Sequence, residues 1–170
     1  MNFKIADFIH NQYPHYVIEL QSIEGVRNLI ITSLTIVLVL ILGRFLNKKT
    51  KLNLAKVICV LIIFLTLYSH LIDLINGNWW LHEDLPLHLC SISNIILCVI
   101  LFIPKNNKLF EFLFYCGFLG GLMAILTPQI NYYDGGVFMY FEYYISHGSI
   151  MLIPLFMFYH LEMKLSKYSW

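Results

Sequence analysis

Residues 29–51 read LIITSLTIVLVLILGRFLNKKTK, and this stretch decides the fold class. Its apolar part is almost entirely leucine, isoleucine and valine, contains no acidic side chain, and runs into a lysine-rich turn. A bilayer core of roughly 30 Å requires about 20 such residues in a helix. The stretch therefore predicts a transmembrane helix that ends in a basic loop.

Four further apolar stretches follow along the chain. Composition agrees with a membrane protein, because 59% of the 170 residues are hydrophobic and only 12% are charged, whereas soluble domains carry about 25% charged residues. We predict an all-α, polytopic transmembrane helical bundle. Its five predicted spans are residues 29–46, 54–75, 85–103, 109–127 and 137–161.

The basic residues predict the orientation of the bundle. Nine of the eleven lysines and arginines lie in or beside the loops after the first and third spans or after the fifth span, and the other two loops contain none. By the positive-inside rule the N-terminus is outside and the C-terminus is cytoplasmic. We expect an external tail (1–26), a single five-helix transmembrane domain (27–163) and a cytoplasmic tail (164–170).

Polar side chains gather in the parts of the spans that point outward. They come from the end of the second and fourth spans and from the start of the third and fifth spans. Ionisable groups inside a membrane cost about 2.5–3.5 kcal/mol at mid-helix on insertion scales and usually mark a functional site. We therefore predict a site in the outer half of the bilayer. The residues are His70, Asp73, His88, Cys90, Ser91, Asn94, Gln129, Glu142, Ser146 and His147.

Cys90 and His147 carry the candidate chemistry. Amide groups near a helix N-terminus favour a thiolate, and a nearby imidazole can accept its proton. A thiolate with a histidine base is suited to acyl transfer through a thioester. Counted from the predicted helix starts, however, Cys90 lies about 7–8 Å deep and His147 about 16 Å deep, so their pairing needs a shift between the helices.

Other polar residues would support this pair or act separately. Donors to an oxyanion stabilise the transition state of acyl transfer. His70 and Asp73 are three positions apart on one helix face and form a second polar pair. The predicted supporting polar residues are His88, Ser91, Asn94 and Gln129.

Alternative interpretations remain open at this point. A packing cysteine and a structural histidine explain the same spacing, and Cys59, Cys98 and Cys116 are themselves expected to be packing residues. Intramembrane polar residues are equally expected in a transporter or permease. A metal site formed by His70, Asp73, His88 and His147 is a third alternative, and a purely structural membrane protein is a fourth.

Three segments resemble a known family. They are LPLHLCSISNIILCVILF (85–102), LTPQ (126–129) and YISHGSIMLIPL (144–155). They resemble the YwaF-like bacterial membrane proteins, which are relatives of the eukaryotic transmembrane protein 164 family. The resemblance runs from about the first span to the end of the chain. Family members generally continue with further membrane helices after the fifth span, and we expect this chain to lack them.

The resemblance also implies an activity. The eukaryotic relatives look like acyltransferases that remodel phospholipids with a cysteine and a histidine, which correspond here to Cys90 and His147. A more distant kinship with androgen-induced hydrolases of fatty-acid esters, which use a threonine and a histidine, points the same way. The expected function is therefore a membrane-embedded lipid acyltransferase or acyl-ester hydrolase in the bacterial plasma membrane.

The expected partners follow from this interpretation. Membrane lipids are the expected substrates, and a second copy of the chain or another membrane subunit is a further candidate partner. The net charge of +1 gives no basis for binding nucleic acid. We expect neither a cofactor nor a metal ion.

Overall fold

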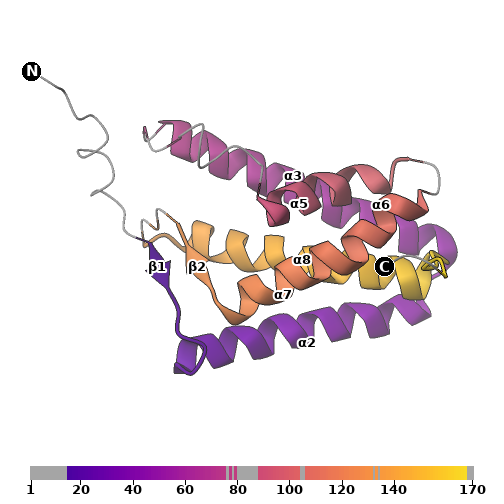
Figure 1. The fold of residues 1–170 in the computed structure, drawn as a ribbon, viewed down its shortest axis with the longest axis horizontal. Coiled ribbons are helices and arrows are strands. Elements are labelled where there is room, and N and C mark those ends of the chain that lie inside the picture. The colour runs from indigo at the N-terminus through magenta and orange to yellow at the C-terminus, as the bar shows by residue number, and fades with distance from the viewer. Residues whose placement is uncertain are drawn as a thin grey trace, which may run out of the picture.

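The computed structural model describes residues 15–75, 77, 79, 88–103, 106–131, 133 and 135–167. This part of the chain is mostly helical (Figure 1). In chain order the elements are β1 (Tyr16–Val17), α2 (Ile23–Phe45), α3 (Lys48–Ile75), α5 (Leu89–Ile100), α6 (Asn107–Phe112), the π-helical turn η1 (Leu113–Gly117), α7 (Phe118–Leu126), β2 (Gln129–Ile130) and α8 (Val137–His160).

Three helices in the described ranges are long and apolar enough to cross a membrane. They are α2, α3 and the continuous helix Asn107–Leu126, which joins α6, η1 and α7. The prediction of membrane helices in these three regions is confirmed. Helices α2 and α3 begin at residues 23 and 48 rather than at 29 and 54, because polar residues continue the first turns of both helices.

The third and fifth predicted spans differ from the other three. Helix α5 has 12 residues, which at 1.5 Å per residue gives about 18 Å, less than a bilayer core of roughly 30 Å. The predicted start of that span at residue 85 lies outside the described residues. Helix α8 has 24 residues and is long enough, but it is less apolar than the other long helices because it carries the polar residues of the fifth span. The number of five crossings therefore stays a prediction.

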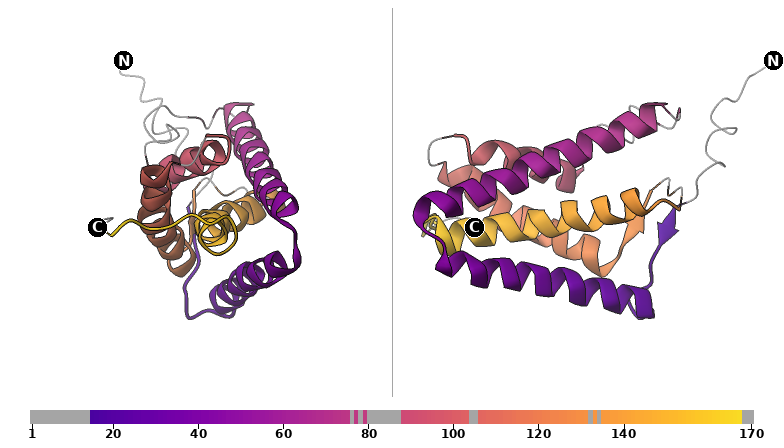
Figure 2. Two further views of the ribbon diagram at one scale, coloured as in Figure 1. Left: turned by 90° about the vertical axis from the view of Figure 1, so that its right-hand side faces the viewer. Right: turned by 180° about the vertical axis from the view of Figure 1, so that it is seen from behind.

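Helix α8 is the central element of the bundle. It contacts α2, α3, α5 and α7, and the view along the bundle places it between them (Figure 2). Its buried residues include Ser146, Gly148 and the segment from Ser149 to Met157 apart from Leu155. A helix that other elements cover on most sides does not have to be amphipathic. Polar residues of α8 such as Ser146 and Ser149 are buried, whereas the apolar Val137, Phe141 and Ile145 form an exposed stripe.

Glycines allow the helices around α8 to approach closely. A Cβ added at Gly121 of α7 would lie 2.7 Å from the Met151 Cγ and 2.8 Å from the His147 carbonyl oxygen. A Cβ added at Gly117 would lie 3.1 Å from the Ile150 Cγ2. Small residues at a helix interface permit this kind of backbone approach in membranes. The glycines of this helix therefore allow it to pack tightly against α8.

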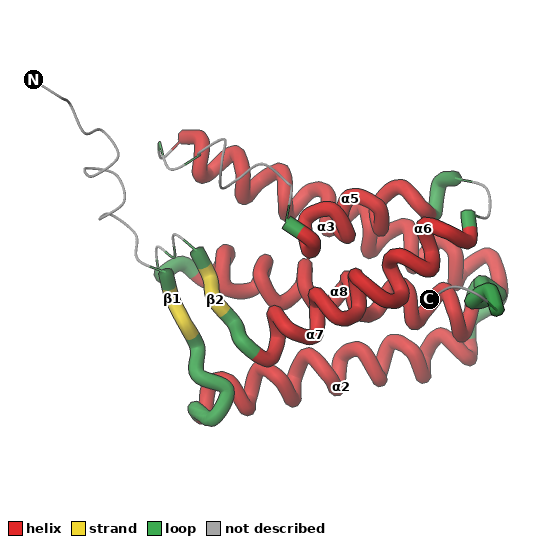
Figure 3. The backbone as a smooth tube through the Cα atoms, viewed as in Figure 1, coloured by secondary structure: helices red, strands yellow, loops and turns green. Residues whose placement is uncertain are grey.

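The two ends of the bundle have different chemistry. At one end, Lys48 Nζ lies 3.3 Å from a carboxylate oxygen of Glu162, and the Ser166 amide donates to Glu111 at 2.7 Å. At the other end, β1 and β2 form a short antiparallel pair (Figure 3), a feature that the sequence did not predict. The start of α3, helix α6 and the C-terminal segment therefore lie together, opposite the strands.

The adjacent glycines of α7 give a direct test of this packing. We expect Gly121→Ala to destabilise the protein by about 1–3 kcal/mol, the usual cost of overpacking, because its new Cβ meets the His147 carbonyl. Gly120→Ala is the matched control, since its Cβ would lie 3.4 Å from the Cys90 Sγ, an ordinary contact. Thermal unfolding in detergent, followed by circular dichroism, measures both. Equal midpoints for the two variants would contradict the packing described here.

Candidate functional site

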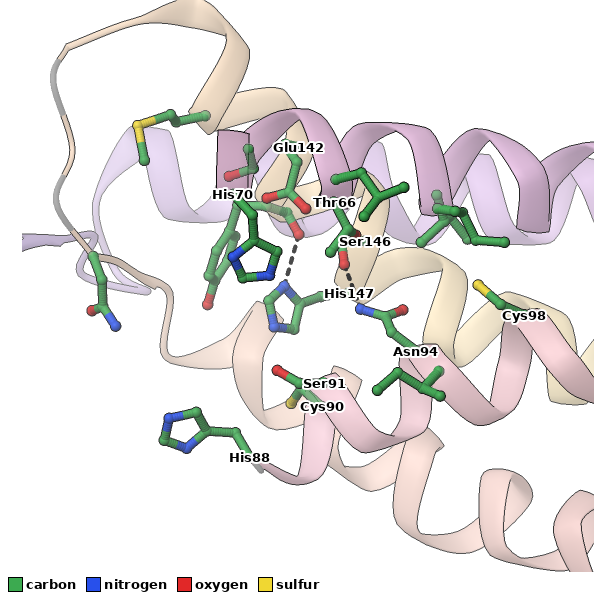
Figure 4. A pocket seen from close by; sticks show the side chains of 18 of the residues that line it. Thr66, His70, His88, Cys90, Ser91, Asn94, Cys98, Glu142, Ser146 and His147 are labelled. Carbon is green, nitrogen blue, oxygen red and sulfur yellow. Dashed lines mark hydrogen bonds between the residues drawn. The ribbon is translucent and has the colours of Figure 1, made fainter. Parts of the chain in front are cut away.

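One cavity of about 580 Å³ lies among α3, α5, α8 and the segment around β2 (Figure 4). Its volume falls within the roughly 300–1,000 Å³ that is typical of ligand pockets. We call it the polar pocket, and it brings together every site residue predicted from the sequence. These are His70, Asp73, His88, Cys90, Ser91, Asn94, Gln129, Glu142, Ser146 and His147.

The relative depth of α5 and α8 places Cys90 and His147 at different levels of this pocket. Asn94 of α5 donates a hydrogen bond from Nδ2 to the Ser146 Oγ at 2.7 Å, which aligns the two helices at this level. Both residues lie nine positions after the predicted starts of their spans, so the alignment agrees with counting from those starts. Cys90 lies about 6 Å before this level and His147 about 1.5 Å beyond it at 1.5 Å per residue. The offset in depth therefore remains, and both residues line the pocket from different levels.

Two contacts hold the imidazole of His147 in place. Its Nδ1 lies 2.8 Å from the Tyr143 carbonyl oxygen. Because a carbonyl can only accept, this contact assigns the proton to Nδ1 and leaves the Nε2 lone pair free. The Tyr143 ring packs against the imidazole with 4.3 Å between centroids. Figure 4 shows the imidazole between His70 and Glu142 on one side and Ser91 and Cys90 on the other.

Tyr143 is itself anchored to the neighbouring elements. Its hydroxyl donates to the Ala124 carbonyl at the end of α7 at 2.9 Å. The same oxygen accepts from the Gln129 amide of β2 at 3.3 Å. The orientation of His147 therefore depends on α7 and β2 as well as on its own helix.

Cys90 lies in the first turn of α5. The helix begins after His88, whose side chain makes no capping hydrogen bond, and the first amides of a helix have no intrahelical partner. The Cys90 Sγ faces Gly120 of α7, at 3.4 Å from the position of an added Cβ. Since Gly121 touches the His147 carbonyl, this glycine pair lies against both predicted catalytic residues.

The α3 side of the polar pocket is acidic. Asp73 is buried with 9% of its surface exposed, and it is close enough to Glu142 of α8 for the two carboxyl groups to interact electrostatically. None of the described residues that line the pocket is a lysine or an arginine. Across the described ranges, no three His, Cys, Asp or Glu side chains are grouped closely enough to hold a metal ion.

A second polar cluster, which the sequence did not predict, joins α2 to α8. Glu24 accepts hydrogen bonds from Tyr140 at 2.6 Å and from Tyr16 at 2.7 Å, and Asn28 donates to Tyr144 at 2.9 Å. The bond to the Glu24 carboxylate raises the pKa of the Tyr16 hydroxyl. The spacing of these residues in the sequence could have indicated the cluster. Glu24 and Asn28 are four residues apart and share a helix face, and so do Tyr140 and Tyr144. We call these five residues the tyrosine clamp.

Apolar helices that surround a polar pocket define an integral membrane protein of the polytopic helical class. Residues 20–170 match the TMEM164 family, and the chain therefore belongs to that family. No curated protein and no solved structure matches the chain. The narrower assignment to YwaF-like bacterial proteins stays a prediction.

The burial of the cysteines predicts an order of reactivity. Cys90 is half-buried in the pocket, whereas Cys59 and Cys98 are buried and contact the Leu97 and Cys59 carbonyls. We expect N-ethylmaleimide to modify Cys90 in the folded protein well before Cys59 or Cys98. Mass spectrometry of peptides from timed samples measures this order, and unfolded protein serves as the control. Simultaneous modification of the three thiols in folded protein would contradict the accessible pocket.

Proposed function

We propose that the protein is a membrane-embedded lipid acyltransferase or acyl-ester hydrolase, with Cys90 as nucleophile and His147 as general base. The observation that carries this proposal is a single pocket, inside a bundle of apolar helices, that both side chains line. Covalent acyl transfer uses a nucleophile together with a base, and this pocket is lined by a residue of each kind. Membership of the TMEM164 family is consistent with a reaction inside the membrane.

The proposed reaction has two halves. His147 Nε2 takes the Cys90 proton, and the thiolate attacks the ester carbonyl of a lipid. The carbon–sulfur bond forms, the carbon–oxygen bond breaks, and the imidazolium returns its proton to the leaving lipid alkoxide. An acceptor hydroxyl, or water in a hydrolase, then gives its proton to His147 and attacks the thioester. The carbon–sulfur bond breaks, and the departing thiolate takes the proton back from His147.

Several groups are placed to assist these steps. The unpaired amides of the first turn of α5 can donate to the developing oxyanion, together with Ser91 and Gln129. Asn94 has a different role from the predicted oxyanion donor. One of its amide hydrogens is engaged by Ser146, and its Oδ1 is buried without a hydrogen-bond partner. We propose that this oxygen accepts a hydrogen bond from the hydroxyl group of the acyl acceptor.

The proposed setting is a bacterial plasma membrane with five crossings, an outside N-terminus and a cytoplasmic C-terminus. Lys48, Glu162 and the C-terminal segment meet at one end of the bundle, and the tyrosine clamp lies toward the other. This distribution agrees with the positive-inside rule and with the preference of tyrosine for the interface. The site then faces the outer leaflet.

A trapped acyl-enzyme tests the proposed chemistry. Protein in phosphatidylcholine vesicles that contain a phospholipid with a radiolabelled acyl chain is expected to become labelled, and neutral hydroxylamine should release the label because thioesters are labile to it. Cys90→Ala should not be labelled. His147→Gln should label about 10²–10⁴-fold more slowly, the usual contribution of a general base. Cys116→Ala is the control and should behave as wild type, because Cys116 does not line the pocket. Equal labelling of Cys90→Ala and wild type would exclude this nucleophile.

A transporter is the second candidate function, favoured by the two acidic residues Asp73 and Glu142 that line one pocket of a membrane bundle. If they carry protons, vesicles with a trapped pH-sensitive dye should show proton flux under an imposed potential. Asp73→Asn should abolish that flux, and Cys90→Ala should leave it unchanged. Flux that does not exceed that of protein-free vesicles would contradict transport.

A further inference from the structure

The polar pocket has an apolar side that the proposed chemistry does not use. Ile63 and Leu67 of α3 and Ile95 and Val99 of α5 all line it. Within each helix the two residues are four apart, so they form a stripe on one face. Their exposed fractions are 39% for Ile63, 64% for Leu67, 50% for Ile95 and 44% for Val99. We call these four residues the paired stripes.

The paired stripes reach from the pocket to the outer surface of the bundle. Side chains that both line a cavity and remain exposed mark the place where the cavity opens. Because α3 is a membrane-crossing helix, the medium outside these apolar residues is hydrocarbon. The opening therefore leads sideways into the bilayer, between α3 and α5.

Contacts between α3 and α5 close the opening at its deep end. The Cys59 thiol donates to the Leu97 carbonyl at 3.4 Å, and the Cys98 thiol contacts the Cys59 carbonyl at 3.7 Å. Beyond this point, toward its C-terminal end, α3 runs away from α8 in both side views (Figures 1 and 2). The opening is thus a wedge that these contacts close at its base. Because the medium outside the wedge is hydrocarbon, we assign a single hydrocarbon chain as its occupant.

The pocket has both polar and apolar lining residues, as the binding of an amphiphile requires. The lining combines the polar residues His88, Gln129 and Asn131 with Cys90, His147 and the apolar paired stripes. Val99, at the far end of the α5 stripe, lies about 14 Å along the helix from Cys90. Leu67 also lines a second cavity of about 350 Å³ with Leu71, Leu74 and Trp79, so apolar surface continues along α3.

We propose that the polar pocket is loaded sideways from the membrane, with one acyl chain of a glycerolipid lying between the paired stripes and its ester beside Cys90. This proposal rests on the proposed function and names its substrate as a lipid that never leaves the bilayer. The chain enters between α3 and α5, and the polar headgroup stays at the His88 and Gln129 end. A soluble acyl donor would have no use for the opening.

Photo-crosslinking in vesicles tests the position of the chain. Full-length protein is reconstituted in phosphatidylcholine that contains a small fraction of phosphatidylcholine with a diazirine at the tip of one acyl chain. After irradiation, mass spectrometry should find adducts concentrated on the paired stripes. Leu34 and Leu38 of α2 form the reference surface, since both are lipid-exposed at 63% and 55% and neither lines the pocket. Adducts of equal yield on the two surfaces would overturn the proposal.

A blocking variant with a matched control sharpens the test. Ile95→Trp should fill the wedge, lower the adducts on the stripes to the yield of the reference surface and slow acyl labelling of Cys90. Leu119→Trp makes the same change on a lipid-exposed face of α7, where 58% of the leucine is exposed, and should alter neither. If Ile95→Trp leaves acyl labelling unchanged, sideways entry is wrong.

The Cys90→Ala variant separates this proposal from the proposed function. Adducts on the stripes should persist in it, because chain binding needs no thiol. Stripe adducts without acyl labelling in wild type would refute the chemistry and leave the lipid site intact. If Ile95→Cys instead forms disulfide-linked dimers in place of lipid adducts, the stripes are an interface between copies, and the proposal fails.

Discussion

The polar side chains of α8 need a protein environment, and this requirement organises the bundle. Glu142, Ser146 and His147 would be costly in contact with hydrocarbon, where an unsatisfied polar group costs several kcal/mol. Helix α8 avoids that cost by lying among α2, α3, α5 and α7, each of which contacts it. The pocket is the place where this enclosure leaves space beside the polar residues.

The close approach of α7 to α8 and α5 helps to define the geometry of the pocket. Gly121 has no room for a Cβ beside the His147 carbonyl, and Gly120 faces the Cys90 thiol, so this pair of glycines lets α7 pack closely against both α8 and α5. The hydrogen bond between Asn94 and Ser146 then sets their relative depth. The tyrosine clamp adds a further constraint, because it fixes the other side of α8 to α2. Packing and hydrogen bonding thus act on the same helix from three directions.

Much of the site could be predicted from the chain because its chemistry is local. The outer polar residues stand out against apolar surroundings within the predicted spans. The first residues of the helices were harder to predict. Polar first turns disguised the beginnings of α2 and α3, and the start of α5 near Leu89 left no clear mark among neighbouring leucines. The pairing of Tyr16 with Ile130 joins segments far apart in the chain, and two-residue strands have no detectable period.

By itself the sequence determined that this is a helical membrane protein with a polar region in its apolar interior, since composition and residue periodicity depend only on neighbours along the chain. The tertiary structure alone decided that Cys90 and His147 line one pocket, that Asn94 meets Ser146, that Glu24 and Asn28 bind the tyrosines of α8, and that the apolar stripes of α3 and α5 flank an opening. These relations depend on where each helix begins and which face it turns inward. Contacts between residues far apart in the sequence determine the start and the buried face of each helix.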